Sequence, residues 1–365
     1  MQERCHIAHL HTNHEWGGGE YQLFHLVKGL ASRGIRTTLF AHPYGKLYER
    51  ACESGLPARA MPAASFAPVL PFSLSSLCRL IVELDVDILH VHDSLATTIG
   101  IGVSRRTKKP VVLSRRIASP LRRNIFSRSK YSPNKLKAVI AISQTVKDVF
   151  GKSGYPDDRI LVVPSGIDIP SLERVERDED FRRGLGGDYL VGGIGKLSRK
   201  KNWQFMARVA AHIAQTGPDI QWCLAGSGTE EGRLDKLVRE LGIKSRFHFL
   251  GFRADANSIL KTVDALFFPS LMEGASVAVR TAMVLGTPVV AVDAPGTLES
   301  LAGHGWLVRS DDVEAAARSI IEALTNAKRR ERVIKAARES AVRRFAFDRT
   351  IEGTIAVYEN ILGER

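Results

Sequence analysis

The chain has 365 residues, of which 44% are hydrophobic, and this length exceeds what one hydrophobic core usually holds. Two domains of ordinary size are therefore expected. Four scattered cysteines, without paired or metal-ligand spacing, argue against a disulfide framework or zinc site and favour a reducing compartment. The first ten residues carry charge where a signal peptide needs an apolar core, and no apolar run approaches about 20 residues. A cytoplasmic chain without a membrane span is expected.

The formal net charge of +13 is concentrated in residues 105–137, which contain twelve Lys and Arg residues and no acidic residue. Within this segment, apolar and basic side chains alternate at helical spacing: Leu121, Arg122, Arg123, Ile125, Phe126 and Arg128. Such a surface is attracted to anionic lipid, by about 1 kcal/mol for each basic side chain near the membrane. A solvated loop is the alternative. Nucleic-acid binding is not expected, because no recognition motif accompanies the charge.

The first half of the chain alternates strand and helix patterns. A strand from Cys5 to His11 is followed by a glycine run, and then by a helix near Tyr21 to Arg33 that ends before Gly34. Further strands are predicted at 37–41, 88–92, 111–114, 139–143 and 160–164. Alternation of this kind predicts a parallel sheet covered by helices on both faces.

The second half repeats the alternation after a charged and weakly patterned segment, 169–187, that suits a linker. Strands are predicted at 189–194, 221–225, 247–250, 265–268, 288–292 and 305–308. A final helix, 348–362, has apolar residues at helical spacing.

Several candidate site residues follow predicted strands, at the edge where parallel sheets bind ligands. Glu273 lies in a turn before a helix, and Gly274 and Ser276 would let main-chain N–H groups at that helix start face an anionic ligand. A second strand leads into a loop with Lys196 and Lys201, whose plainer interpretation is a solvated basic loop.

Candidates in the first half are weaker individually. The run Gly17 to Glu20 either lets the main chain approach a ligand or is a flexible turn. His92 ends a predicted central strand, where a packing role is the alternative, and His90 is the weaker candidate because we expect it on the other face. Asp85 and Asp87 open a strand and are not expected to bind metal.

The order and spacing of these motifs resemble the retaining GT-B glycosyltransferases of family 4. The segments that carry the resemblance are 16–22, 87–93, 140–143, 163–168, 193–202, 225–228, 251–253, 268–291 and 295–299. The resemblance implies an α/β protein of two Rossmann-like domains facing a cleft. An acceptor-binding domain would comprise residues 1–168 with the C-terminal helix 348–365, and a nucleotide-sugar-binding domain residues 169–347.

The resemblance also implies residue roles. His92 would stand beside the donor sugar, through its imidazole or main-chain carbonyl, and Glu273 would hydrogen-bond a sugar hydroxyl. Lys196 and Lys201 would stabilise the departing diphosphate in place of a metal ion. Residues implied around the donor are Gly18, Gly19, Gly195, Gly228, Phe252, Arg253, Gly274, Ala275, Ser276, Val277 and Thr281. Glu299 is expected to be structural.

Two positions depart from the family pattern. Lys196 replaces the usual arginine and lacks its bidentate fork, and Thr281 replaces a glutamate that grips the ribose. Lys196 is expected to weaken or reorient the phosphate contact. For Thr281 two outcomes are open: donor binding is weaker, or the ribose is held by a neighbouring residue or by water. A non-catalytic accessory subunit whose site decayed at Thr281 is the main alternative, and an epimerase or hydrolase on the same fold is another.

The implied function is transfer of a sugar from a nucleotide-sugar donor, with retention at the anomeric carbon and without a metal or other cofactor. From the basic segment 105–137, we expect a glycan or lipid-linked acceptor, as in lipopolysaccharide or other cell-envelope synthesis. The same segment predicts peripheral binding at the anionic inner face of the cytoplasmic membrane. The donor sugar, nucleobase and linkage are not predicted.

Overall fold

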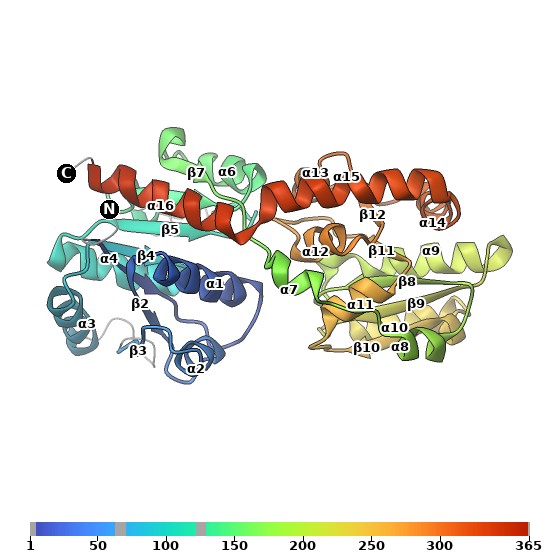
Figure 1. Cartoon of the computed structure of the whole chain (residues 1–365), viewed down its shortest axis with the longest axis horizontal. Helices are drawn as coiled ribbons and strands as arrows, with labels where there is room; N and C mark the ends of the chain where they lie inside the picture. The colour runs from blue at the N-terminus through green and yellow to red at the C-terminus, as the bar shows by residue number, and fades with distance from the viewer. Residues whose placement is uncertain (1–4, 63–70, 122–128, 364–365) are drawn as a thin grey trace. The chain divides into compact units, whose positions relative to one another are not determined.

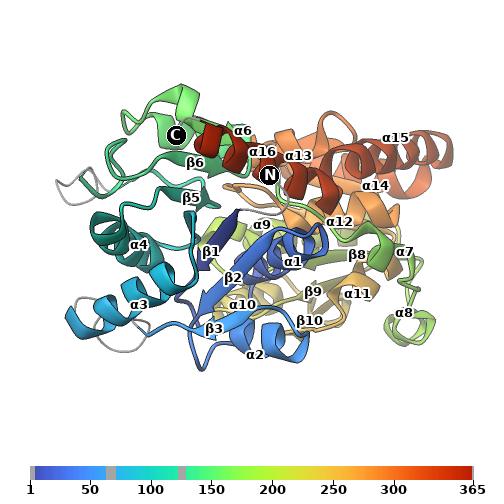
Figure 2. The ribbon, with the colours of Figure 1, turned by 60° about the vertical axis from the view of Figure 1, so that its left-hand side comes forward.

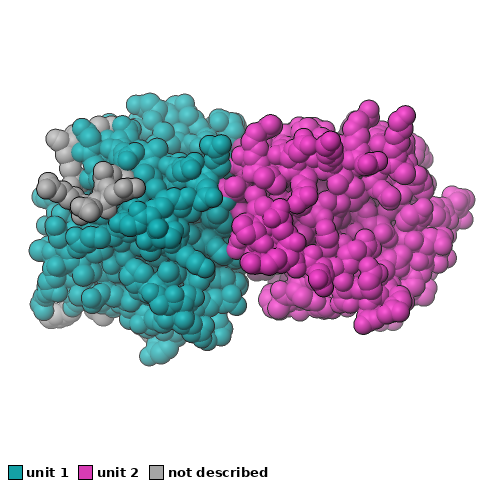
Figure 3. Space-filling view, in the orientation of Figure 1, with its two compact units in different colours: residues 1–166, 347–365 teal, residues 167–346 magenta. Residues whose placement is uncertain are grey.

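The computed structural model describes residues 5–62, 71–121 and 129–363, and divides into two compact units (Figure 3). Unit 1 comprises residues 1–166 and 347–365, and unit 2 comprises residues 167–346. The sequence analysis placed the divisions after residues 168 and 347. No helix within the described ranges is long and apolar enough to cross a bilayer.

Unit 1 is built on a sheet of seven parallel strands in the order β3-β2-β1-β4-β5-β6-β7 (Figures 1 and 2). Its strands are β1 (His6–Leu10), β2 (Arg36–Ala41), β3 (Ala58–Ala60), β4 (Ile88–Val91), β5 (Val111–Arg115), β6 (Ala138–Ala141) and β7 (Ile160–Val162). The central strands β1, β4 and β6 are buried along their whole length, as expected for a parallel sheet covered on both faces.

Helices cover both faces of this sheet. They are α1 (Gly18–Ser32), α2 (Lys46–Glu53), α3 (Pro71–Glu83), α4 (Ser94–Thr107), α6 (Gln144–Gly151) and α16 (Phe347–Gly363), with a short 3₁₀ turn, η1 (Asp157–Arg159). Leu26 and Leu30 of α1 pack with Ile351 and Tyr358 of α16 against the sheet, and α16 runs beside α1 in Figure 1. Gly29 allows this packing, because a Cβ there would lie 2.1 Å from Ile351 Cδ1.

Unit 2 contains six parallel strands in the order β10-β9-β8-β11-β12-β13. They are β8 (Tyr189–Ile194), β9 (Ile220–Ala225), β10 (Phe247–Gly251), β11 (Ala265–Phe268), β12 (Val289–Val292) and β13 (Trp306–Val308). Its helices are α7 (Ile169–Glu173), α8 (Glu179–Leu185), α9 (Trp203–Thr216), α10 (Glu231–Glu240), α11 (Ala256–Thr262), α12 (Val277–Leu285), α13 (Pro295–Leu301), α14 (Val313–Thr325) and α15 (Ala327–Phe345), with 3₁₀ turns η2 (Arg199–Lys201) and η3 (Lys244–Arg246).

The α/β class with two Rossmann-like units is confirmed, and the predicted strands lie within two residues of the observed ones. Two expectations are corrected. The segment 169–187 contains α7 and α8, each with an aspartate cap, Asp168 and Asp178, rather than an irregular linker. Strand β3 was missed, because it is an edge strand of only three residues, Ala-Arg-Ala, without a β-branched or aromatic side chain.

Candidate active site

Both sheets reverse their strand order at one point, between β1 and β4 in unit 1 and between β8 and β11 in unit 2. Ligands of open parallel sheets bind beyond the carboxyl ends of the strands at such a reversal. In unit 1, this position holds the segments that begin at His11 and His92. In unit 2, it holds the segments that begin at Gly195 and Pro269.

A buried ionic cluster joins the two segments of unit 1. His11 Nε2 lies 2.8 Å from Glu20 Oε1, and His11 Nδ1 lies 3.1 Å from Asp93 Oδ2. Burial acts to lower the pKa of His11, but its hydrogen bonds and ion pairs with the two carboxylates outweigh burial and raise that pKa. Burial acts to raise the pKa of Asp93, yet His11 and two main-chain N–H groups bring it to about 2. The two carboxylates therefore favour the imidazolium form of His11.

The same carboxylates tether the loop between β1 and α1. Thr12 donates to Asp93 through its main-chain N, at 2.7 Å, and through its hydroxyl, at 2.8 Å. Asn13 Nδ2 donates to Glu20 Oε1 at 3.0 Å, and Asp93 also caps α4 by accepting from the N–H of Ala96. The loop is thus held at its first three residues, His11, Thr12 and Asn13.

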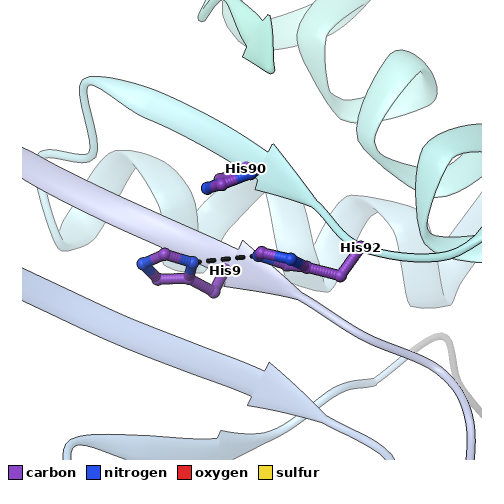
Figure 4. A group of neighbouring side chains, drawn as sticks. All are labelled: His9, His90 and His92. Atoms are coloured by element: carbon purple, nitrogen blue, oxygen red, sulfur yellow. Dashed lines mark hydrogen bonds between the residues drawn. The ribbon is translucent and has the colours of Figure 1, made fainter. Parts of the chain in front are cut away.

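His92 lies beside His9 and His90 under the carboxyl edge of the sheet (Figure 4). His9 Nδ1 and His92 Nε2 are 3.0 Å apart, and Nη1 and Nη2 of Arg116 each donate to His92 Nδ1 at 3.2 Å. Burial, followed by the charges of neighbouring basic groups, lowers the pKa of both His9 and His92, so both rings are neutral. Only 7% of His92 is exposed.

The expectation that His90 faces away from His92 is wrong. Their ring centroids are 4.1 Å apart, because residues two apart on a strand share a face. His90 Nδ1 lies 2.6 Å from the Tyr358 hydroxyl and His90 Nε2 lies 2.8 Å from Ser114 Oγ, which makes His90 a hydrogen-bonded core residue.

The glycine run of unit 1 also differs from expectation. Helix α1 begins at Gly18, so Gly18 and Gly19 belong to its first turn rather than to a preceding loop. A Cβ at either position would meet nothing within 4 Å. The space beside their main chain is therefore open, while Glu20 turns inward to His11.

Lys201 and Glu273 meet at the strand reversal of unit 2. Lys201 Nζ lies 2.6 Å from Glu273 Oε1, which also accepts from the Ser270 hydroxyl at 2.6 Å. The ammonium group lies 4.7 Å from the ring centroid of Phe268, the last residue of β11. The structure thus brings together two residues that the sequence analysis assigned to different parts of the donor.

Close glycine packing shapes the loops around this pair. Gly195 and Gly226 have φ of +148° and +149°, and a Cβ on Gly226 would lie 2.0 Å from the Gly195 carbonyl oxygen. A Cβ on Gly228 would lie 2.3 Å from the Leu197 carbonyl oxygen. Lys196 is exposed between these contacts, and its carbonyl accepts from Trp203 Nε1 at 3.1 Å.

The turn after β11 leads into α12. Gly274 and Ala275 are half-buried, and the Ser276 hydroxyl caps α12 by accepting from the N–H of Val279 at 3.3 Å. Val277, the first helical residue, is 37% exposed, whereas Thr281 is 4% exposed. The hydroxyl of Ser276 therefore serves the helix, which leaves main-chain N–H groups as the polar groups at this helix start.

The remaining predicted donor residues, Phe252 and Arg253, follow β10. Phe252 is 78% exposed, and its role at the donor stays a prediction. Arg253 Nε donates to Asp255 Oδ1 at 2.7 Å, so its charge is paired within unit 2.

The basic segment 105–137 is not a uniform lipid-facing surface. Arg115 Nη2 donates to the Ser119 carbonyl, Arg116 contacts His92, and Lys130 contacts Ser94, so these three cations face the protein. The residues expected to form its helical core, 122–128, lie outside the described residues. Arg105, Arg106 and Lys108 are exposed at the end of α4.

Sequence reasoning missed His11, Asp93, Arg116 and Ser270 as site neighbours. His11 and Asp93 follow strands β1 and β4, and parallel pairing of these strands was a signal that could have placed them together. Arg116 and Ser270 follow β5 and β11 in the same manner, but the choice among several basic and hydroxyl residues there needed the fold.

Two family models match this chain. Glycosyltransferase Family 4 matches residues 16–170, and Glycosyl transferases group 1 matches residues 176–340. The chain belongs to the family 4 glycosyltransferases of GT-B fold. This glycosyltransferase is 28% identical to 2-deoxystreptamine N-acetyl-D-glucosaminyltransferase of Streptomyces fradiae, over 95% of this chain and 91% of that protein.

Two further similarities bear on this glycosyltransferase. It is 24% identical to the Escherichia coli UDP-Gal:alpha-D-GlcNAc-diphosphoundecaprenol alpha-1,3-galactosyltransferase, over 68% of this chain and 69% of that protein. The fold matches that of Anabaena HepE in complex with UDP and glucose, with a TM-score of 0.83 at 21% identity, over 98% of this chain and 100% of that structure.

Proposed function

We propose that this glycosyltransferase moves a sugar from a uridine-diphosphate donor to a glycan or lipid-linked acceptor, with retention at the anomeric carbon and without a metal ion. The observation that carries the proposal is the Lys201–Glu273 pair at the carboxyl edge of β8 and β11. It offers a cation for a leaving diphosphate and a carboxylate for a sugar hydroxyl within 2.6 Å of each other. The start of α12 beside it adds main-chain N–H groups that favour negative charge.

In this mechanism, Lys201 stabilises the charge that develops on the diphosphate as the glycosidic bond breaks, and exposed Lys196 adds a second cation. Glu273 accepts a hydrogen bond from a hydroxyl of the transferred sugar and fixes its orientation. The acceptor hydroxyl attacks from the face that the leaving group departs from, and its proton passes to the leaving phosphate oxygen. The transferred sugar therefore keeps its anomeric configuration.

Unit 1 is proposed to bind the acceptor, with the first residues of α1 and the end of β4 at its catalytic edge. The open main chain at Gly18 and Gly19 supports this assignment. A lipid-linked acceptor is supported by the diphosphoundecaprenol substrate in the name of the Escherichia coli relative and by the exposed Arg105, Arg106 and Lys108. We propose that these side chains hold the enzyme at an anionic membrane surface.

The test is nucleotide release by the purified full chain from a panel of UDP-sugars, with a membrane glycolipid extract as acceptor and one arm in EDTA. Acceptor-dependent release with one donor, unchanged by EDTA and lost in Lys201→Ala, is expected. Lys200→Ala is the matched control, because Lys200 is exposed in the same loop and should retain release. The anomeric configuration of the product, read by proton NMR, tests retention. Donor binding without release under every condition would favour the accessory-subunit alternative.

A further inference from the structure

His9, His90 and His92 form a buried group in which one ring nitrogen of each histidine lies within 4.8 Å of one ring nitrogen of each of the others (Figure 4). Three neutral imidazoles are a common metal-binding set. Their hydrogen bonds indicate a different use. Both nitrogens of His90 have protein partners, Tyr358 and Ser114, and both nitrogens of His92 do as well, Arg116 and His9.

The direction of these hydrogen bonds follows from Arg116. A guanidinium group has only hydrogen-bond donors. His92 Nδ1 accepts hydrogen bonds from Nη1 and Nη2 of Arg116, so it must be the ring nitrogen without a proton. The proton of neutral His92 is then on Nε2, from which it is donated to His9 Nδ1 at 3.0 Å. His9 consequently carries its own proton on Nε2, a buried atom without a hydrogen-bond partner among the described residues.

A metal ion bound to these histidines would disrupt the hydrogen bonds that run from Arg116 to His92 and from His92 to His9. Ligation through His92 Nε2 would require the proton to move to Nδ1, where it would point at the Arg116 guanidinium. The ion would also lie close to the positive charge of Arg116 in a site of low dielectric. Arg116 remains charged at neutral pH, because burial lowers its pKa only to about 10.

We infer that Arg116 is a positioning residue of the transfer reaction: it locks the His92 imidazole in the Nε2-protonated form against His9 and thereby fixes the main chain at the end of β4. Since both ring nitrogens are engaged, the imidazole is not available to a substrate, and the main-chain carbonyl of His92 is the group left to face the donor sugar. This role rests on the proposed function.

The position of Arg116 supports the inference. Val112, Ser114 and Arg116 lie at every second position of β5 and its continuation, so their side chains share one face of the sheet. The same face carries His90 of β4 and His92, which follows β4. Arg116 is half-buried, with Nε fully covered, so its side chain has little freedom. The main-chain N–H of His92 is in turn bonded to the Leu10 carbonyl at 3.1 Å, which anchors the same segment to β1.

The first arm of the test is NMR of the full chain labelled with ¹⁵N-histidine, assigned with His9→Asn and His92→Asn variants. We expect wild-type His92 and His9 each to show a protonated Nε2 and an unprotonated Nδ1. In Arg116→Met, the His92 signals should move toward a mixture of tautomers. A wild-type His92 with a protonated Nδ1 would overturn the inference. This arm needs no turnover, so failure of the proposed function would not affect it.

The second arm compares kinetics of Arg116→Met and Arg116→Lys with the UDP-sugar identified above. We expect kcat to fall roughly 10- to 100-fold in Arg116→Met, as for a small displacement of a positioned group, with donor KM changed less than about threefold. Arg116→Lys keeps a cationic N–H donor group and should recover part of kcat. Arg115→Met is the matched control and should keep wild-type kcat, because Arg115 donates to the Ser119 carbonyl instead.

The positioning role would be overturned if Arg116→Met kept wild-type kcat. It would also be overturned if donor KM rose while kcat stayed unchanged. The metal alternative is tested by titrating the full chain with Co²⁺ and following its visible absorption. Stoichiometric Co²⁺ bands that disappear in His9→Asn would also overturn the inference, whereas absence of such bands is expected.

Discussion

Lys201 and Glu273 are 72 positions apart in sequence, yet Nζ of the lysine lies 2.6 Å from Oε1 of the glutamate. The side chains are 22% and 12% exposed, so the pair is largely shielded from solvent. Removal of either partner leaves a partly buried charge without its counterpart. The two residues should therefore act as one unit in catalysis.

We expect Lys201→Ala and Glu273→Gln each to lower kcat about 100- to 1000-fold, the usual loss for one electrostatic group in an active site. The double variant should lose little more than either single variant, because each change already disables the pair. Steady-state UDP release measures all three. A double variant whose loss equals the product of the single losses would show that the residues act independently.

Much of the fold was predictable because parallel α/β sheets have long apolar strands and regular helices. The strand Tyr189–Ile194 and the strand Ala265–Phe268 were predicted with their observed bounds, since both are continuous apolar runs that end at glycine or proline. Strand β3 and helices α7 and α8 were missed, because three, five and seven residues are too few for a periodic pattern, although an aspartate cap precedes each helix.

The site was predictable only one residue at a time. Lys201 and Glu273 were recognised from motifs, but their ion pair depends on the adjacency of β8 and β11, which no local pattern encodes. Arg116 was counted with the lipid-facing cations, because net charge does not report the direction of a side chain. His11 was missed because its place in the site depends on contacts with the carboxylates of Glu20 and Asp93, which are 9 and 82 positions away in sequence. These contacts raise its pKa and are not visible in the local sequence.

Substitution of Gly296 tests how the main chain at Glu273 is held in place. A Cβ on Gly296 would lie 2.2 Å from the Glu273 carbonyl oxygen, so Gly296→Ala must displace the turn that carries Glu273. We expect kcat for UDP release to fall roughly 100-fold, since a displacement of about 1 Å at a positioning group has an effect of this size. Unchanged kcat would show that the turn adapts without moving the carboxylate.

Gly232→Ala is the matched control for this substitution. Gly232 lies in helix α10, and a Cβ there would meet nothing within 4 Å. This variant should keep wild-type kcat and gain up to about 1 kcal/mol in unfolding free energy, because alanine favours helix more than glycine does.

Substitution of the exposed cations at the end of α4 tests the proposed membrane binding. We expect the triple variant Arg105→Glu, Arg106→Glu, Lys108→Glu to lose co-sedimentation with vesicles of anionic phospholipid, and wild-type binding to weaken as salt is added. The triple variant Lys328→Glu, Arg332→Glu, Lys335→Glu is the control for charge alone, because these residues are exposed on α15 of unit 2. Equal loss in both variants would indicate attraction by net charge rather than by this surface.

His11 should give the stability of unit 1 a characteristic pH dependence. Its pKa is raised above the ordinary 6.5, so its stabilisation is complete below pH 6.5 and is lost as pH rises through the folded-state value. Asp93 has a lowered pKa of about 2, against an ordinary 3.8, so its stabilisation is present above pH 3.8 and is lost only as pH falls toward 2. Stability from this cluster should be greatest between these limits.

The measurement is hydrogen exchange of main-chain amides in β1 and β4 of the full chain, from pH 6 to 9. We expect wild-type opening free energies, corrected for intrinsic exchange, to decline above pH 6.5, and this decline to be absent in His11→Asn. At pH 6, His11→Asn should cost roughly 3–5 kcal/mol, since it leaves two carboxylates without their cation. His6→Asn is the control: burial lowers the pKa of His6, so its titration lies below pH 6.5 and the decline above it should persist. A decline that survives in His11→Asn would assign the pH dependence to other groups.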